Sequence, residues 1–243
     1  MKKTLLLIIA LCASISTYAQ TSIENMSLDV TGTYTDEVII NGVNRIQDVY
    51  GLGLNVTSPA TNNIVPVDVT VGGLFMPTGN GQPEGSIWNA GIGKTFTIND
   101  DYALRLEGGI TSINTEVPNI PDTVEGSVTA ALINPLVTPY VSYVHDWNIQ
   151  QNGFAIGLRK DIAIDMNGVH WFDLTPSVSY YIFDDYDAFL AKARLSLVRW
   201  NRFTPFFEAR FNDADFDNGV NVNWATHEAN SETSYLAGVS FNF

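Results

Sequence analysis

Three aspartates near the C-terminus have a spacing that could ligate calcium. Asp213, Asp215 and Asp217 alternate along the chain, and alternate carboxylates in a loop can converge on one hard cation. The calcium loop also requires a glycine at its sixth position and a glutamate at its twelfth, where this sequence has Asn218 and Trp224. We therefore interpret the segment as a solvated acidic loop and predict no metal site, with calcium as the alternative.

The three histidines are the other candidates for chemistry. Nucleophilic catalysis by serine requires a histidine base and a polar group that orients it. His145, His170 and His227 lie in no serine-hydrolase motif, and the sequence has no G-x-S-x-G elbow. We predict that the protein is not an enzyme and that it binds no cofactor.

A larger set of charged residues falls on the polar side of alternating apolar and polar segments. If that side encloses a lumen, these side chains line it, and the candidate lining residues are Lys94, Arg105, Glu107, Arg159, Lys192, Arg194, Glu208 and Arg210. One interpretation is a basic wall along which anionic solutes move. The other is a network of buried ion pairs, because Asp29, Asp68 and Asp173 are assigned to the same side. We favour the network, although pairing and conduction are compatible.

The segments that carry these residues have a period of two, which predicts β-strands. Leu52, Leu54 and Val56 alternate with small or polar residues, and the same pattern recurs along the whole chain. Eleven segments are clear, and treating Val124 to Leu132 as a strand adds a twelfth. A single-chain bacterial barrel has an even strand count. We predict an all-β, transmembrane, antiparallel up-and-down β-barrel of about 12 strands, with 10 or 14 as alternatives.

The connections divide into short turns at one end and longer loops at the other, as expected for such a barrel. The predicted short periplasmic turns are Asn99 to Asp101, Asn134 to Leu136, Asp165 to Gly168 and Asn201 to Arg202. The predicted outer loops are Thr35 to Gln47, Met76 to Gly85, Asn114 to Pro121 and Asn212 to Glu232.

The first nineteen residues have the layout of a secretory signal peptide. Lys2 and Lys3 precede an apolar run, and Ala19 provides a small residue for cleavage. The apolar run is shorter than the roughly 20 residues that span a bilayer as a helix. We predict cleavage near Ala19, which removes the only cysteine, and a single domain over residues 20–243. The net charge of −14 argues against nucleic acid as a partner.

Four tryptophans fall at the ends of predicted strands, where barrels carry aromatic girdles at the membrane interfaces. They are Trp88, Trp147, Trp171 and Trp200. A soluble β-sandwich would also have period two, but the export signal and the many charges on the polar side favour a membrane barrel.

The last strand resembles the C-terminal assembly signal of outer-membrane proteins, in which a glycine is followed by two aromatic residues at alternate positions. Gly238, Phe241 and Phe243 match that pattern, and Leu236 departs from it. The mature chain thus resembles small bacterial outer-membrane β-barrel proteins. The resemblance implies the outer membrane as location, and its lipid and the barrel-assembly machinery as partners.

Two functions follow as hypotheses. The first is a small passive channel for small polar or anionic solutes. The second is a closed structural barrel whose extracellular loops, chiefly Asn212 to Glu232, bind a partner.

Overall fold

The computed structural model describes residues 27–40, 43–58, 67–76, 85–115, 122–148, 150–199, 203–216 and 232–242. These residues form one antiparallel sheet of thirteen strands. The strands are β1 (Ser27–Ile40), β2 (Val43–Ser58), β3 (Asp68–Met76), β4 (Gly85–Thr97), β5 (Ala103–Thr115), β6 (Thr123–Ile133), β7 (Thr138–Asp146), β8 (Gln151–Arg159), β9 (Ile162–Met166), β10 (Val169–Phe183), β11 (Tyr186–Leu197), β12 (Phe203–Phe216) and β13 (Glu232–Asn242). Within these ranges, no helix is long and apolar enough to cross a membrane.

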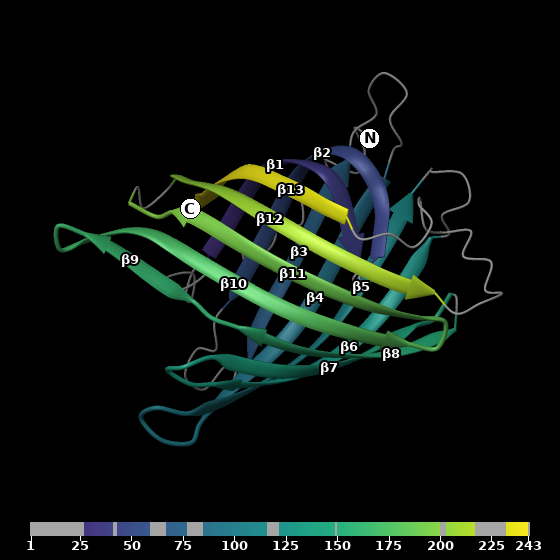
Figure 1. Cartoon of the computed structure of the whole chain (residues 1–243), viewed down its shortest axis with the longest axis horizontal. Coiled ribbons are helices and arrows are strands. Elements are labelled where there is room, and N and C mark those ends of the chain that lie inside the picture. Colours follow the sequence, from purple (N-terminus) through teal and green to yellow (C-terminus); the bar gives the residue numbers. More distant parts are fainter. Residues whose placement is uncertain are drawn as a thin grey trace, which may run out of the picture.

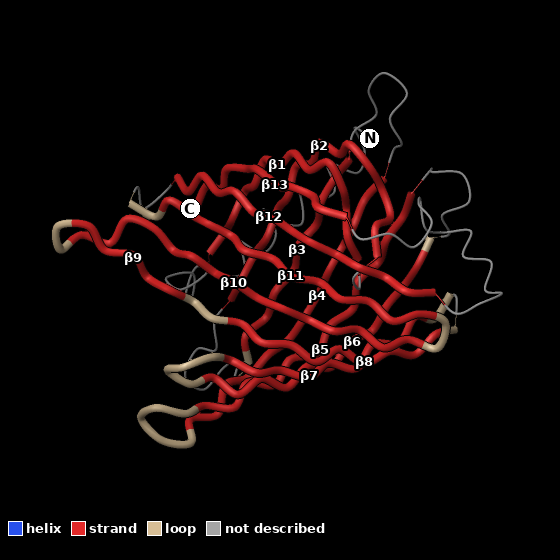
Figure 2. The backbone as a smooth tube through the Cα atoms, viewed as in Figure 1, coloured by secondary structure: helices blue, strands red, loops and turns tan. Residues whose placement is uncertain are grey.

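The sheet closes on itself into a barrel (Figures 1 and 2). The first strand pairs with the last, in a register that runs from Asp29 opposite Asn242 to Thr35 opposite Leu236. Every other neighbouring pair along the chain from β1 to β8 and from β10 to β13 is also hydrogen-bonded, and β10 joins β8. A closed barrel leaves no continuous sheet edge unpaired.

The barrel has twelve strand positions, because β8 and β9 are two parts of one interrupted strand. β10 pairs with β8 over Ser177 to Phe183 and with β9 over Val169 to Leu174. At the break between them, the Lys160 amide donates a hydrogen bond to the carbonyl of Pro176 at 3.0 Å. The predicted count of twelve is thus confirmed, and the predicted strand Val124 to Leu132 is β6.

The short predicted turns join strands at one end of the barrel, which we call the turn end. They connect β4 to β5, β6 to β7 and β9 to β10. In the last of these, Asn167 and Gly168 have φ angles of 56° and 73°, as a two-residue type I′ hairpin turn requires. The predicted loop from Thr35 to Gln47 is wrong, because β1 and β2 stay paired as far as Ile40 and Val43.

Alternate residues face out of and into the barrel, and the outward side is apolar. Val128, Ile92 and Ile156 are 62%, 58% and 59% exposed, although their types are usually buried in soluble proteins. The inward side buries polar groups such as Ser179 and Thr35. This arrangement is the reverse of a β-sandwich, so the sandwich alternative is excluded.

Aromatic rings pack on glycines directly opposite them in neighbouring strands. On the inward side, Phe183 of β10 lies over Gly153 of β8, Tyr140 of β7 lies over Gly157 of β8, and Phe206 of β12 lies over Gly238 of β13. A side chain on any of these glycines would collide with the ring. The rings therefore occupy space that only glycine leaves free.

The described tryptophans lie near strand ends, as predicted. Trp147 directly follows β7, Trp88 is the fourth residue of β4, and Trp171 is the third of β10. Trp88 packs edge-on against Phe75 at 4.7 Å, and the Arg199 guanidinium lies 3.9 Å from the Trp171 ring. Other predicted features lie outside the described residues: the signal peptide over residues 1–19, Trp200, Asp217, His227 and Phe243.

Candidate solute site in the barrel lumen

Seven of the eight candidate lining residues face the interior. On β5, Leu106 and Ile110 are 42% and 53% exposed on the outer face, which places the alternate residues inside. The same alternation around exposed apolar residues on β8, β11 and β12 places the rest inside. The inward residues are Arg105, Glu107, Arg159, Lys192, Arg194, Glu208 and Arg210.

Lys94 does not line the lumen, so its assignment was wrong. It is two residues from both Ile92 and Phe96, and therefore lies on their face of β4. Its register partner is the outward Leu106, and its ammonium group lies 5.3 Å from the centre of the Phe96 ring. A cation near the end of a strand can extend its charged head past the apolar surface.

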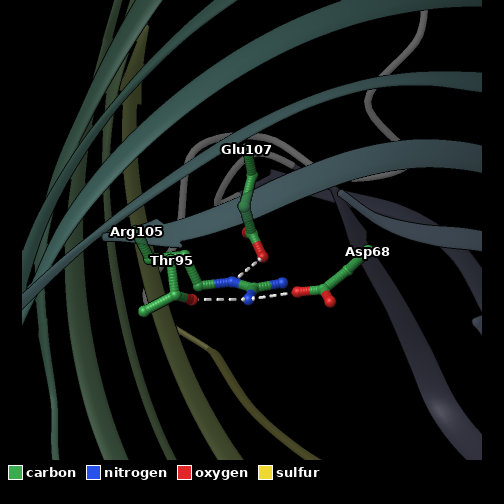
Figure 3. A network of polar contacts seen from close by, with 4 residues as sticks. All are labelled: Asp68, Thr95, Arg105 and Glu107. Carbon is green, nitrogen blue, oxygen red and sulfur yellow. Dashed lines mark hydrogen bonds and ion pairs between the residues drawn. The ribbon is translucent and has the colours of Figure 1, made fainter. Parts of the chain in front are cut away.

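One wall of the lumen holds a network centred on Arg105 (Figure 3). Its Nε donates to Glu107 Oε1 at 2.5 Å, and its Nη1 donates to Asp68 Oδ2 at 2.7 Å and to Thr95 Oγ1 at 3.1 Å. The alternation of β3, β4 and β5 places these three partners on the inner face. Two carboxylates thus share one guanidinium group.

The other wall is basic and only partly paired. Arg210 Nε lies 2.6 Å from Glu208 Oε1, and this pair is largely buried. The Arg159 guanidinium pairs with Asp161 at 2.9 Å, and both side chains are more than half exposed. The predicted network of ion pairs is therefore present in part.

Two cations on this wall form no ion pair with a described carboxylate. The Arg194 guanidinium stacks 3.7 Å from the centre of the Phe206 ring and donates to Ser196 Oγ at 3.4 Å. Lys192 and Arg194 have no carboxylate within ion-pair distance among the described side chains. Both face a cavity of about 520 Å³ whose lining also includes the hydroxyls of Thr175, Ser177 and Ser196 and the carboxylates of Asp161, Asp173 and Glu208.

The charges are distributed unevenly around the lumen, with most of the described inward cations on one wall. Across β1 to β7, the described inward carboxylates are those of Asp29, Asp68, Glu107, Glu125 and Asp146, with Arg105 as the cation. From β8 to β12, the described inward cations are those of Arg159, Lys192, Arg194 and Arg210, and the carboxylates of Asp161, Asp173 and Glu208 line the same part of the lumen. Alternation could have identified Glu125 and Asp146, because each shares a strand face with polar neighbours, but the distribution depends on which strands face each other.

Beside the acidic network, the wall is recessed. A cavity of about 280 Å³ is bounded by Arg105, Glu107 and a set of small residues that includes Gly91, Gly93 and Gly109. Because glycine has no side chain, the barrel wall is thin at these glycines of β4 and β5.

Toward the end opposite the turn end, one side of the lumen is filled by an apolar cluster. Val144, Phe183, Tyr186, Ala188 and Ala214 are all buried there. The rings of Phe183 and Tyr186 stack 4.8 Å apart at an interplanar angle of 8°. The charged residues of the basic wall lie on the turn-end side of this cluster, because they follow it along β11 and precede it along β12.

The two described histidines have structural contacts. His145 packs edge-on against Trp147 at 5.6 Å, and its Nδ1 lies 3.0 Å from the side-chain oxygen of Asn152. His170 Nε2 lies 2.8 Å from Asp173 Oδ1. The β9–β10 pairing has an irregularity between His170 and Phe172, next to this second contact.

The acidic motif is a strand rather than a loop where the structure describes it. Asp213 and Asp215 belong to β12 and share its outward face with Phe211. An extended strand holds alternate carboxylates in a row, whereas a calcium loop folds them around the ion. No group of three or more histidine, cysteine or carboxylate residues in the described ranges is arranged to hold a metal.

No protein-family model and no curated protein sequence matches this chain. Solved structures do match its fold. The NanC porin superposes with a TM-score of 0.55 at 17% identity, over 89% of this chain and 100% of that one. The KdgM porin matches with a TM-score of 0.52 at 10% identity, over 89% and 99%. An outer-membrane channel from Pseudomonas putida F1 matches with a TM-score of 0.53 at 9% identity, over 90% and 94%. The chain therefore has the closed β-barrel fold of bacterial outer-membrane porins and channels.

Proposed function

We propose that the protein is a passive outer-membrane channel that admits small polar solutes and favours those with an anionic group. The observation that carries this proposal is the pair of inward cations, Lys192 and Arg194, which face a cavity of about 520 Å³ without ion-pair partners among the described side chains. Lys192 is exposed to the lumen and Arg194 is partly exposed, so a solute in the cavity can reach both charges.

The outer surface supports a membrane location. Its exposed apolar residues include Ile92, Ile110, Val128 and Ile156, and exposed apolar area on this scale needs a non-aqueous environment. A closed barrel satisfies the backbone hydrogen bonds that lipid cannot. Fold neighbours that are porins and channels, together with the predicted export signal, support the outer membrane. The turn end would then face the periplasm.

The C-terminal strand would serve assembly. We propose that the barrel-assembly machinery binds the segment containing Gly238, Phe241 and Phe243. The first two lie on opposite faces of β13: Gly238 faces inward beneath Phe206, and Phe241 faces outward against Phe203, with ring centres 5.3 Å apart. Phe241 thus presents an outward aromatic surface that a partner protein could contact.

Reconstitution into planar lipid bilayers tests the channel. We expect discrete conductance steps in KCl and a reversal potential that shows preference for chloride. The double variant Lys192→Gln/Arg194→Gln should move the reversal potential toward cation preference. Lys94→Gln is the matched control, since it removes one charge from the outer face and should leave the reversal potential unchanged. Absence of conductance steps at every salt concentration would contradict the proposal.

One observation favours the second candidate, a closed barrel that acts through its outer loops. The stacked rings of Phe183 and Tyr186 fill part of the lumen between the basic wall and the loops. If this cluster closes the path, the native protein should not conduct and Phe183→Ala/Tyr186→Ala should. Equal conductance of the native protein and the variant would contradict closure by these rings.

A further inference from the structure

The recess of about 280 Å³ beside Arg105 and Glu107 is lined mainly by glycines and uncharged polar residues. We propose that it binds the ring of a small, uncharged polyhydroxy solute. Its floor would be Gly91 and Gly109, and its hydrogen-bonding groups would include the side chains of Asn89, Thr111 and Ser127. This inference rests on the proposed channel function, because a solute must enter the lumen to reach the recess.

Two glycines in adjacent strands form the floor of the recess. Gly91 of β4 and Gly109 of β5 are register partners, and the same row continues to Thr70 on β3 and to Ser127 on β6. Neighbouring strands lie about 4.8 Å apart, so the backbones at Thr70 and Ser127 are about 14 Å apart, three strand spacings. The glycines therefore leave a gap in the row of inward side chains between two hydroxyl groups.

The nearest neighbours of both glycines are backbone atoms. A Cβ atom on Gly91 would lie 3.4 Å from the carbonyl oxygen of Gly108, and one on Gly109 would lie 3.3 Å from the carbonyl oxygen of Ala90. The glycines beneath Phe183, Tyr140 and Phe206 differ, because a ring atom is the nearest neighbour of each. Glycine within a strand often marks a position that a ligand or another backbone approaches closely.

Four polar side chains around this floor have unused hydrogen-bonding capacity. Elsewhere on the inner face such groups bond to each other: Thr129 Oγ1 lies 2.8 Å from Ser142 Oγ, and the Tyr140 hydroxyl lies 2.5 Å from Ser179 Oγ. Within the described ranges, no hydrogen bond forms to the side chains of Thr70, Asn89, Thr111 and Ser127. These groups are thus available to a solute.

Hydroxyl and amide groups suit a solute that is itself rich in hydroxyls. A serine or threonine hydroxyl both donates and accepts hydrogen bonds, and an asparagine side chain offers two donor hydrogens and an acceptor oxygen. Each hydroxyl of a polyol also donates and accepts, so both capacities are used. An ionised carboxylate only accepts, which would leave the acceptors of the recess unused. The recess therefore favours an uncharged polyhydroxy ring over an anion of the same size.

The charged residues at the border of the recess do not set this preference. Arg105 and Glu107 lie on its turn-end side (Figure 3), and the Arg105 guanidinium donates to Glu107, Asp68 and Thr95. The Glu107 side chain is 48% exposed, so its carboxylate can also accept a hydrogen bond from a solute hydroxyl. Such a bond requires no net charge on the wall.

Saturation-transfer NMR on the full-length protein in detergent micelles tests the recess without requiring a current. Three molecules with the same six-carbon ring serve as probes: myo-inositol, cyclohexane-1,4-diol and cyclohexanecarboxylate. We expect myo-inositol to reach half-saturation at a concentration about tenfold lower than either of the other two, because it alone can use several of the free polar groups together.

Two variants change the recess in different ways. Gly91→Val fills the floor, and Asn89→Ala/Thr111→Val removes two polar groups without narrowing the space. Each should raise the half-saturation concentration of myo-inositol about tenfold. Gly53→Val is the matched control: Gly53 alternates with the exposed Leu52 on β2 and so faces inward, and an added Cβ there meets its nearest atom at 3.6 Å. It should leave myo-inositol binding unchanged.

Two results would overturn the inference. Unchanged myo-inositol binding in Asn89→Ala/Thr111→Val would show that the recess holds only water. Binding of cyclohexanecarboxylate at concentrations as low as those of myo-inositol would show that charge, rather than hydroxyl content, selects the solute. Because the Asn89→Ala/Thr111→Val variant adds no bulk, it tests the recess even if Gly91→Val does not fold. Absence of conductance steps with NMR binding intact would overturn the channel function and not the recess.

Discussion

Gly238 lies directly beneath the ring of Phe206, its register partner across the β12–β13 pair. A Cβ atom at position 238 would stand 2.5 Å from Phe206 Cζ and 2.6 Å from the carbonyl oxygen of Gly32 on β1. The glycine therefore keeps three strands close together at the seam where the barrel closes. The match of Gly238 to the C-terminal assembly pattern thus coincides with a packing requirement.

Substitution at this seam should destabilise the barrel. We expect Gly238→Val to cost about 1–3 kcal/mol, the usual range for overpacking, because the Phe206 ring or the backbone must move. The measurement is the free energy of unfolding in urea, followed by tryptophan fluorescence. Gly32→Ala is the control, since an added Cβ there meets no atom within 4 Å. Equal stability of the two variants would refute the packing role of Gly238.

The buried pair of Glu208 and Arg210 should behave as a unit. Arg210→Met leaves the Glu208 carboxylate, which is 9% exposed, without its partner, and removal of one member of a buried pair costs about 3–5 kcal/mol. The double variant Glu208→Gln/Arg210→Met should recover much of that loss. Urea unfolding of both variants and of Glu208→Gln completes a double-mutant cycle, and additive losses would show that the pair is not coupled.

The outward assignment of alternate residues on β6 can be tested with one charge. Val128→Arg places a guanidinium group on the outer face, where a charge at the middle of a bilayer costs about 2–4 kcal/mol. Its neighbour Ser127 faces inward, so Ser127→Arg should cost much less. Folding yield into lipid vesicles checks both, and equal yields would argue against a lipid-facing surface at this position.

The β9–β10 turn should depend on glycine at position 168. Gly168 has a φ angle of +73°, a conformation that strains residues with a side chain. Gly168→Val should lower stability by about 1–2 kcal/mol, since a left-handed β-branched residue is strained. Asn167→Gly is the matched variant and should be tolerated. The midpoint of urea unfolding compares them, and an unchanged midpoint for Gly168→Val would contradict the turn geometry.

Much of the fold was predictable because alternation is a local property of the chain. On β5, alternation alone predicts that Leu106 faces outward and that Arg105 and Glu107 face inward. The requirement for an even strand count correctly predicted β6. Lys94 shows the limit of this approach, because a shift of one residue exchanges the two faces. The strand was found, yet the side chain was placed on the wrong face.

The arrangement of charges around the lumen could not be predicted from spacing. Asp68 on β3 contacts Arg105 on β5, across the intervening strand β4. The two residues are 37 positions apart in the chain. That contact, and the position of Lys192 on the opposite wall, depend on strand order and register across the whole sheet. The break at Lys160 and the irregularity near Trp171 were also not predicted, because neither interrupts the alternation enough to be seen.

The rings that lie on glycines also bear on how the barrel finds its pairing. A slip of two residues between neighbouring strands keeps every side chain on its proper face, so alternation by itself does not penalise that error. Such a slip would move Phe183 from Gly153 to Gln151 or Ala155, and Phe206 from Gly238 to Leu236 or Ser240. The rings would then meet side chains instead of open backbone. Each ring and its glycine therefore favour the native strand register over the registers shifted by two residues, which keep the same side chains on the same face.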